Sequence, residues 1–107
     1  MIGRTVTVAV DRPLGSAHPE YPDLIYPVNY GFVPSVLGGD GEEQDAYILG
    51  VDRPLERFTG QLIARIRRLD DVEDKWVVAP EGSRFTKEQI AAAVDFQERF
   101  FQSEIEL

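Results

Sequence analysis

The sequence predicts an α+β fold: a small, partly open β-barrel of about five strands, with one amphipathic helix near the C-terminus. Three observations lead to this expectation. Short runs of β-branched and aromatic residues alternate with turn residues over most of the chain. One longer stretch then shows helical spacing of apolar residues behind a capping motif. With 107 residues, 43% of them hydrophobic, the chain suits one domain, residues 1–107, with a modest core.

Five extended segments are expected, at residues 5–10, 26–33, 46–51, 60–69 and 75–79. The first alternates Thr and Val, and the third is apolar on both faces, as a buried strand is. In the fourth, alternation places Arg68 on the face of Ala64 and Ile66. Residues 16–25 contain two prolines and are expected to form a loop. This order of elements predicts an OB-like barrel closed by a helix.

The helix is expected from Thr86 to about residue 102. Thr86 and Gln89 have the spacing of a capping box, which favours a helix start at this point. Its apolar stripe consists of Ile90, Ala93, Val94, Phe96, Phe100 and Phe101. We expect these aromatic rings, and that of Trp76, to pack in the core; the alternative for Trp76 is stacking on a substrate.

Residues 26–34, with the sequence YPVNYGFVP, are expected to hold a tyrosine at a rigid bend. Pro27 has a fixed φ and favours an extended conformation before it. Asn29 and Gly31 tolerate positive φ on either side of Tyr30, so a sharp bend is expected there.

Two acidic clusters follow this segment. They consist of Asp40, Glu42, Glu43 and Asp45 among glycines, and of Asp70, Asp71, Glu73 and Asp74 beside Lys75. Close carboxylates repel by on the order of a few kcal/mol at low effective dielectric, and a hard divalent cation such as Mg²⁺ or Ca²⁺ removes that cost. The alternative is that such Gly-rich acidic stretches are solvated hairpin turns.

Composition excludes several classes of function. The net charge of −8 makes the chain a poor nucleic-acid binder, because phosphate contacts need a basic surface. The absence of cysteine excludes disulfides, thiolate catalysis and zinc–thiolate sites. No signal peptide or apolar run of membrane-spanning length is seen, so a cytoplasmic protein without membrane partners is expected.

The pentapeptide VDRPL occurs twice, ending the first and third strands with residues 10–14 and 51–55. One interpretation is that both copies are strand-exit turns, because Asp and Pro favour turns. The other is that Arg12 or Arg53 faces an anion, since guanidinium suits bidentate contacts with phosphate.

The residues that remain for chemistry are carboxylates, a tyrosine, a lysine and arginines. His18 is the only histidine and precedes a proline, so we interpret it as a surface or phosphate-contacting residue and not as a general base. This inventory favours metal-assisted hydrolysis, in which Mg²⁺ ions activate water and polarise a phosphoryl oxygen. Lys75 and an arginine would offset charge on the leaving phosphate, and a spare carboxylate would accept the proton of the water.

These motifs resemble those of soluble family I inorganic pyrophosphatases. Y-P-x-N-Y-G at residues 26–31, followed by the acidic turn with Asp40, Glu42 and Asp45, is similar to the family pattern Y-P-x-N-Y-G and D-G-D-P-x-D. The strand over 60–69, the second acidic cluster and Lys75 resemble the family's second metal-binding hairpin.

The resemblance implies hydrolysis of pyrophosphate with Mg²⁺, for which Mn²⁺ is a possible substitute. Tyr30 is expected near the nucleophilic water, Lys75 at the phosphate, and Glu42 in the place of the family's proposed general base. The metal ligands are expected among Asp40, Glu42, Asp45, Asp70, Glu73 and Asp74, with either Glu73 or Asp74 closing the second cluster.

The chain also departs from the family pattern. The family carries a basic hairpin before its Tyr-Pro motif, where this chain has only residues 11–25, and its C-terminal Tyr-Lys pair is replaced by two phenylalanines. Arg12 and His18, and also Arg4, are the candidates to bind substrate instead. Basic groups from another subunit are a further possibility, since bacterial members of the family are oligomers.

Three functions are therefore compared. The first is an Mg²⁺-dependent phosphoanhydride hydrolase, with pyrophosphate as the expected substrate. The second is a pyrophosphatase-like module that binds a divalent cation or phosphate with little or no turnover. The third is a structural domain whose acidic turns are solvated.

Overall fold

The computed structural model describes residues 2–70 and 72–107. Asp71, a member of the second acidic cluster, lies outside the described residues. The elements, in chain order, are β1 (Thr5–Arg12), β2 (Asn29–Leu37), β3 (Glu43–Ile48), β4 (Arg57–Arg68), β5 (Asp74–Ala79), α1 (Lys87–Glu98) and β6 (Ser103–Glu106).

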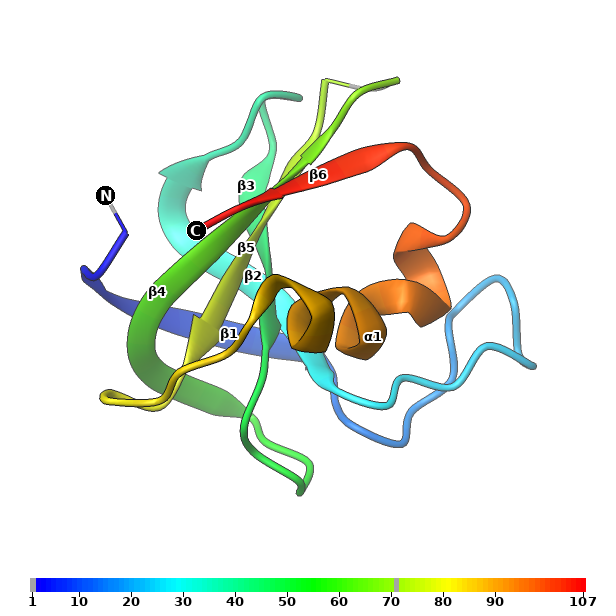
Figure 1. Cartoon of the computed structure of the whole chain (residues 1–107). Coiled ribbons are helices and arrows are strands. Elements are labelled where there is room, and N and C mark those ends of the chain that lie inside the picture. Colours follow the sequence, from blue (N-terminus) through cyan, green and yellow to red (C-terminus); the bar gives the residue numbers. More distant parts are fainter. Residues whose placement is uncertain (1, 71) are drawn as a thin grey trace.

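Within the described residues, the strands form one sheet with the order β1-β2-β3-β5-β4-β6, and an additional pairing of β1 with β4 closes it into a barrel (Figure 1). The β3–β5 pair is parallel, and the other pairs are antiparallel. The long strand β4 contributes to three pairs, with β1, β5 and β6. The α+β barrel expected from the sequence is confirmed: the β1–β4 pairing closes β1, β2, β3, β5 and β4 into the barrel, and β6 pairs with β4 outside this ring.

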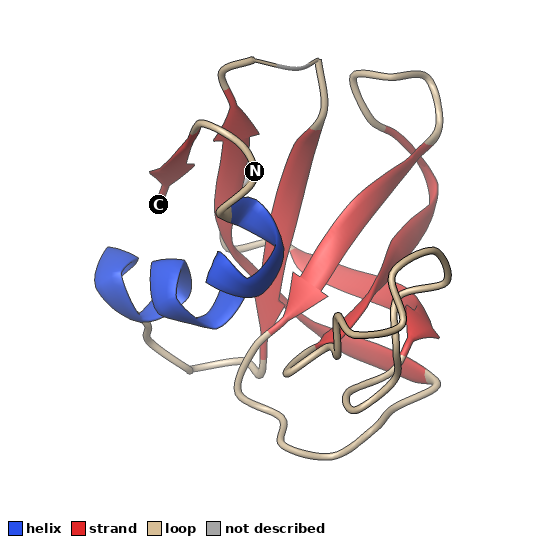
Figure 2. Ribbon diagram, turned by 90° about the vertical axis from the view of Figure 1, so that its right-hand side faces the viewer, coloured by secondary structure: helices blue, strands red, loops and turns tan. Residues whose placement is uncertain are grey.

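Helix α1 lies against one side of the barrel (Figure 2). Its capping box is present: Thr86 Oγ1 accepts from the Gln89 backbone N–H, and the Gln89 side chain accepts from the Thr86 backbone N–H. Ile90 and Val94 are buried in a cluster with tyrosines and aliphatic residues of the barrel. A second cluster contains Trp76, so the predicted core role of this tryptophan is confirmed.

The predicted C-terminal boundary of the helix was wrong. Helix α1 ends at Glu98, and residues 103–106 form β6. The backbone edge of β4 explains the difference, because Ser103–Glu106 pairs there with residues 65–68 and gains ladder hydrogen bonds. The two phenylalanines at 100 and 101 therefore follow the helix and do not continue its stripe.

The predicted bend at Tyr30 was also wrong, because β2 runs straight through this residue from Asn29. Gly31 is not among the glycines with positive φ. It is needed for a different reason: a Cβ at this position would overlap the backbone of Ala9. The absence of a side chain lets β1 approach β2 closely, beside the bulge that precedes Arg12.

One buried side chain joins the two VDRPL segments. Asn29 is fully buried, and its Oδ1 accepts from the backbone N–H groups of Leu14 and Leu55, both at 3.0 Å. These leucines are the same position of the two repeats. The Asn29 Nδ2 donates to the Arg53 carbonyl oxygen at 2.9 Å. The repeated pentapeptide is thus a pair of strand exits that share one carboxamide.

In the part of the chain that the structure describes, no helix combines the length and the apolarity that a bilayer crossing requires.

Asn29→Ala should lower the free energy of unfolding by about 2–4 kcal/mol, because it leaves two backbone N–H groups and one carbonyl group without their buried partner. Urea unfolding would measure the loss. The control is Gln61→Ala, which removes a single exposed hydrogen bond to the Gly3 carbonyl oxygen and should cost less than about 1 kcal/mol. Equal losses in the two variants would contradict the role given to Asn29.

Candidate functional site

A pocket of about 970 Å³ lies where five strands, the loop before β2 and the end of the helix meet. The strands supply Arg12 from β1, Tyr30 from β2, Asp45 from β3, Arg68 from β4 and Lys75 from β5. The remaining wall comes from Glu73, from His18 and residues 20–24, from Gln97 and from the two phenylalanines after the helix. Segments from across the chain therefore contribute charged groups to one cavity.

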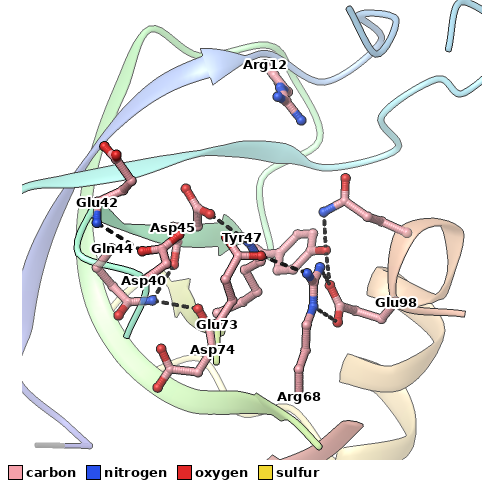
Figure 3. Close-up of polar contacts among 12 residues, drawn as sticks. Arg12, Asp40, Glu42, Gln44, Asp45, Tyr47, Arg68, Glu73, Asp74 and Glu98 are labelled. Atoms are coloured by element: carbon pink, nitrogen blue, oxygen red, sulfur yellow. Dashed lines mark hydrogen bonds and ion pairs between the residues drawn. The ribbon is translucent and has the colours of Figure 1, made fainter. Parts of the chain in front are cut away.

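Lys75 links the two acidic clusters. Its ammonium lies 2.6 Å from Asp45 Oδ2 and 3.6 Å from Glu73 Oε1, and its side chain is only 4% exposed. Figure 3 shows Asp45 and Glu73 together with Arg68, with which Glu73 forms an ion pair. The same ammonium lies 5.8 Å from the centroid of the Tyr30 ring. One residue from each predicted cluster thus meets the predicted lysine and tyrosine in the pocket.

Asp40 and Glu73, one from each acidic cluster, influence each other's pKa. Burial raises the pKa of Glu73, the charge of Lys75 lowers it, and the carboxyl group of Asp40 raises it. The backbone N–H of Glu42, 3.0 Å from Asp40 Oδ1, lowers the pKa of Asp40, and Glu73 lowers it further. Asp40 itself is exposed and does not line the pocket.

The other predicted ligands lie elsewhere. Asp74 forms an ion pair of 3.0 Å with Arg65, and by alternation along β5 it points away from the side of Lys75. Asp70 accepts from the Gln102 backbone N–H at 3.5 Å. Glu42 is exposed and outside the pocket. Over residues 2–70 and 72–107, no group of three or more His, Asp or Glu side chains is arranged to hold a metal ion.

All four predicted substrate-binding residues line the pocket: Tyr30 and Lys75, and also Arg12 and His18 from among the three candidates to replace the family's basic groups. Arg12 Nη1 donates to the Tyr26 hydroxyl at 2.6 Å, and its guanidinium lies 5.6 Å from the ring centroids of both Tyr26 and Tyr30. The Nδ1 atom of His18 accepts from a backbone N–H in its own loop. The third candidate, Arg4, lies over the Trp76 ring and not in the pocket.

Sequence reasoning missed Arg68 as a pocket residue. Its guanidinium donates to both carboxylate oxygens of Glu98, at 2.9 and 3.1 Å, and to Glu73 at 3.0 Å. It also lies 3.6 Å from the centroid of the Phe101 ring. The signal was present in the sequence, because strand alternation places this arginine on the core face with Ala64 and Ile66. A charge on a core face needs a buried partner.

A chain of polar side chains backs the pocket. Tyr47 donates to Glu98 at 2.7 Å and accepts from the Gln97 Nε2 at 2.7 Å. Tyr26 donates to the Gln97 Oε1 at 2.8 Å and accepts from Arg12. The sequence contained a hint of this chain too, because Glu98 falls on the apolar stripe, four residues after Val94. This network attaches the end of the helix to the barrel behind the charged residues.

Burial strongly influences the pKa values of Tyr30 and Tyr47, whose rings pack in the core of the barrel. Burial, and then the charge of Asp45, raise the pKa of Tyr30 far above its usual range. Burial, and then Glu98, raise the pKa of Tyr47 in the same direction. Both rings therefore keep their phenolic protons near neutral pH and act as hydrogen-bond donors.

The mixed five-stranded barrel with its packed helix is a fold that this chain shares with solved inorganic pyrophosphatases. The chain is similar to the inorganic pyrophosphatase of Ehrlichia chaffeensis, with a TM-score of 0.71, 16% identity, and coverage of 97% of this chain and 85% of the other. It is similar to the Helicobacter pylori enzyme, with a TM-score of 0.66, 18% identity and coverage of 95% and 82%. For the Neisseria gonorrhoeae enzyme the TM-score is 0.64, the identity 25% and the coverage 88% and 72%.

No protein-family model matches the sequence, and no curated protein does either. The likeness lies in the three-dimensional arrangement of the elements, and the resemblance inferred from the sequence motifs is confirmed as a likeness of fold.

Tyr30→Phe should reduce the loss of stability at alkaline pH. Above a pH of about 10 the unfolded chain releases the phenolic proton while the folded chain keeps it. The folded state then binds more protons, so stability falls as pH rises, by up to about 1.4 kcal/mol per pH unit for this group. Urea unfolding between pH 9 and 11 would show a shallower decline in Tyr30→Phe than in Tyr21→Phe, whose ring is exposed. Identical declines would contradict the burial assigned to the phenol.

Lys75→Met should lower the free energy of unfolding by about 3 kcal/mol, because it leaves the partly buried carboxylate of Asp45 without its cation. The double variant Lys75→Met/Asp45→Asn should recover part of the loss. Arg99→Met is the control, since its pair with Asp95 is exposed and should contribute less than about 0.5 kcal/mol. No recovery in the double variant would mean that Lys75 stabilises the fold by packing alone.

Proposed function

We propose that the protein hydrolyses a phosphoanhydride, with inorganic pyrophosphate as its simplest substrate. The observation that carries the proposal is the convergence of Tyr30, Asp45, Glu73 and Lys75 in one pocket. The likeness of fold to inorganic pyrophosphatases supports it, since those proteins are named for this activity. The cavity holds both cations that can bind phosphate and carboxylates that can accept a proton.

In the proposed reaction, the oxygen of a water molecule attacks one phosphorus atom and the bond from that phosphorus to the bridging oxygen breaks. Lys75 and Arg12 bind the phosphoryl oxygens and offset the negative charge that develops on the leaving phosphate. A carboxylate of the pocket, Asp45 or Glu73, accepts the proton of the water. The Tyr30 hydroxyl, which stays protonated, donates a hydrogen bond that orients the reacting groups.

A divalent cation, Mg²⁺ with Mn²⁺ as a substitute, is part of the proposal. The donor chemistry fits, because Asp40, Asp45 and Glu73 offer carboxylate oxygens, the ligand type that Mg²⁺ prefers, and Lys75 already places a positive charge between Asp45 and Glu73. Within the described residues these carboxylates are not grouped as a metal cluster, so they would hold the cation only after moving closer together. When bound, it would supply water of lowered pKa and polarise the phosphoryl group. Of the six ligands that the resemblance implied, our proposal uses these three.

A second candidate function is a binding module with little turnover. It is favoured by the pairing of Asp45 and Glu73 with Lys75 and Arg68, because protein cations already neutralise these carboxylates. Such a pocket could hold a phosphate without activating water. The cytoplasmic location and the assembly into homo-oligomers stay predictions from the sequence.

Phosphate release from pyrophosphate in the presence of Mg²⁺ tests the proposed function. Asp45→Asn should lower kcat about 100-fold or more, because it removes a proton acceptor and an anionic oxygen from the pocket. The matched control is Asp52→Asn, an exposed acid outside the pocket, which should keep the wild-type rate. Circular dichroism would confirm that both variants fold.

The same samples separate the candidate functions. Mg²⁺ at 100 times its Kd should raise the unfolding free energy of the wild type by about 2.7 kcal/mol, and Asp45→Asn should lose most of this gain. Stabilisation by Mg²⁺ without phosphate release would favour the binding module. If Mg²⁺ neither stabilises the protein nor supports phosphate release, the structural domain is the remaining interpretation.

A further inference from the structure

The pocket is larger than the proposed substrate requires. Its volume of about 970 Å³ is at the upper end of the range of about 300–1,000 Å³ that encloses drug-sized organic ligands. Bare pyrophosphate is much smaller than such ligands. The charged residues Lys75, Asp45 and Arg68 lie on barrel strands, whereas the loop and the post-helix segment supply apolar and aromatic residues. The cavity therefore has a charged floor, formed by the strands, and a rim of different chemistry.

Two exposed aromatic rings from distant segments belong to this rim. Tyr21 is 63% exposed and comes from the loop before β2, and Phe100 is 68% exposed and follows the helix. Exposed single apolar residues are common on protein surfaces. Here, however, both rings border the cavity that contains the cationic side chains of Arg12, Arg68 and Lys75. Pro22 and Leu24 add apolar surface beside them.

The Tyr21 ring is supported from within. Its centroid lies 5.1 Å from that of His18, which in turn lies 6.3 Å from the buried Tyr26 ring, with 13° between the two planes. Tyr21 thus ends a series of rings that starts in the core. An exposed ring held by such a series offers a flat surface on which another planar group can stack.

The charges of the lining residues indicate which part of a ligand would bind at the rim. Glu20 and Asp23 line the pocket beside Tyr21, so the rim repels phosphate and offers acceptors for hydroxyl or amino groups. The floor holds Arg12 and Lys75, which attract phosphate. The ligand that fits this arrangement has a phosphoanhydride at one end, and at the other a planar, uncharged group with hydrogen-bond donors.

We propose that the substrate is a nucleoside diphosphate, with its base stacked at Tyr21 and Phe100 and its phosphates on the floor of the pocket. This inference rests on the proposed hydrolysis. The oxygen of water bonds to the terminal phosphorus, the bond from that phosphorus to the bridging oxygen breaks, and the products are a nucleoside monophosphate, inorganic phosphate and a proton. Stacking accepts any base, so the preference is for the class and not for one nucleotide.

Phosphate release from ADP, pyrophosphate and tripolyphosphate, each with Mg²⁺, tests the inference. Tripolyphosphate matches the charge and size of a longer anion but has no base. Tyr21→Ala and Phe100→Ala should each raise the KM for ADP by about 5- to 100-fold, the range expected for a lost stacking ring. Their effect on the KM for the two inorganic substrates should be much smaller. Leu37→Ala, at an exposed residue outside the pocket, is the control for ADP hydrolysis.

The outcomes for the two proposals differ. Hydrolysis of the inorganic substrates without hydrolysis of ADP would overturn the inference and leave the proposed function in place. ADP hydrolysis that is equal in wild type and in both rim variants would also overturn it. If no substrate is hydrolysed, the proposed function fails, and calorimetry with ADP and pyrophosphate decides the inference. ADP must then bind more tightly than pyrophosphate, and Tyr21→Ala must remove the difference.

Light scattering on the same variants tests the competing role of the rim. A wild-type dimer that becomes monomeric in both Tyr21→Ala and Phe100→Ala would show that these rings join two copies of the chain, and would overturn the inference. An unchanged molar mass in both variants supports it.

Discussion

The carboxamide of Asn29 is the interaction on which the arrangement of the pocket depends. It is fully buried and binds the backbone of two strand exits, at Leu14 and Leu55, which are far apart in the chain and share the turn residues Asp and Pro. The first exit leads from Arg12 into the loop that carries His18 and Tyr21, and the neighbouring residue on β2 is Tyr30. A buried polar group costs free energy unless every partner is present, so this junction has one favourable geometry.

Charge compensation is the second constraint. Lys75 and Arg68 are almost fully buried cations, and each is paired with carboxylates from another segment of the chain. Removing one partner of such a pair leaves a charge in a medium of low dielectric, which costs far more than an exposed pair contributes. The pocket therefore combines cations for phosphate with carboxylates for water or metal. These ion pairs hold the cationic side chains and the carboxylates in place. The same pocket architecture therefore suits both a hydrolase and a binding module.

Much of the fold and part of the site could be predicted from local patterns. The barrel, the capping box at Thr86 and the burial of Trp76 followed from alternation and capping chemistry, which involve residues close together in sequence. The local sequence patterns did not predict β6, because a strand of four residues is defined by the edge of β4 with which it pairs and not by its own composition. It assigned Gly31 to a bend, whereas the need for glycine comes from the backbone of β1, a segment far away in the chain.

The sequence by itself determined which chemical groups are available: carboxylates in two clusters, Lys75, Tyr30 and no cysteine or second histidine. It also determined the motif that predicted this fold. Only the tertiary structure decided which carboxylates meet, since Glu73 faces the pocket while the adjacent Asp74 pairs with Arg65. Neighbouring residues of a strand point to opposite sides, so a shift of one position changes a side chain's whole environment. Such a choice is made by strand register and by contacts across the barrel, which no short stretch of sequence contains.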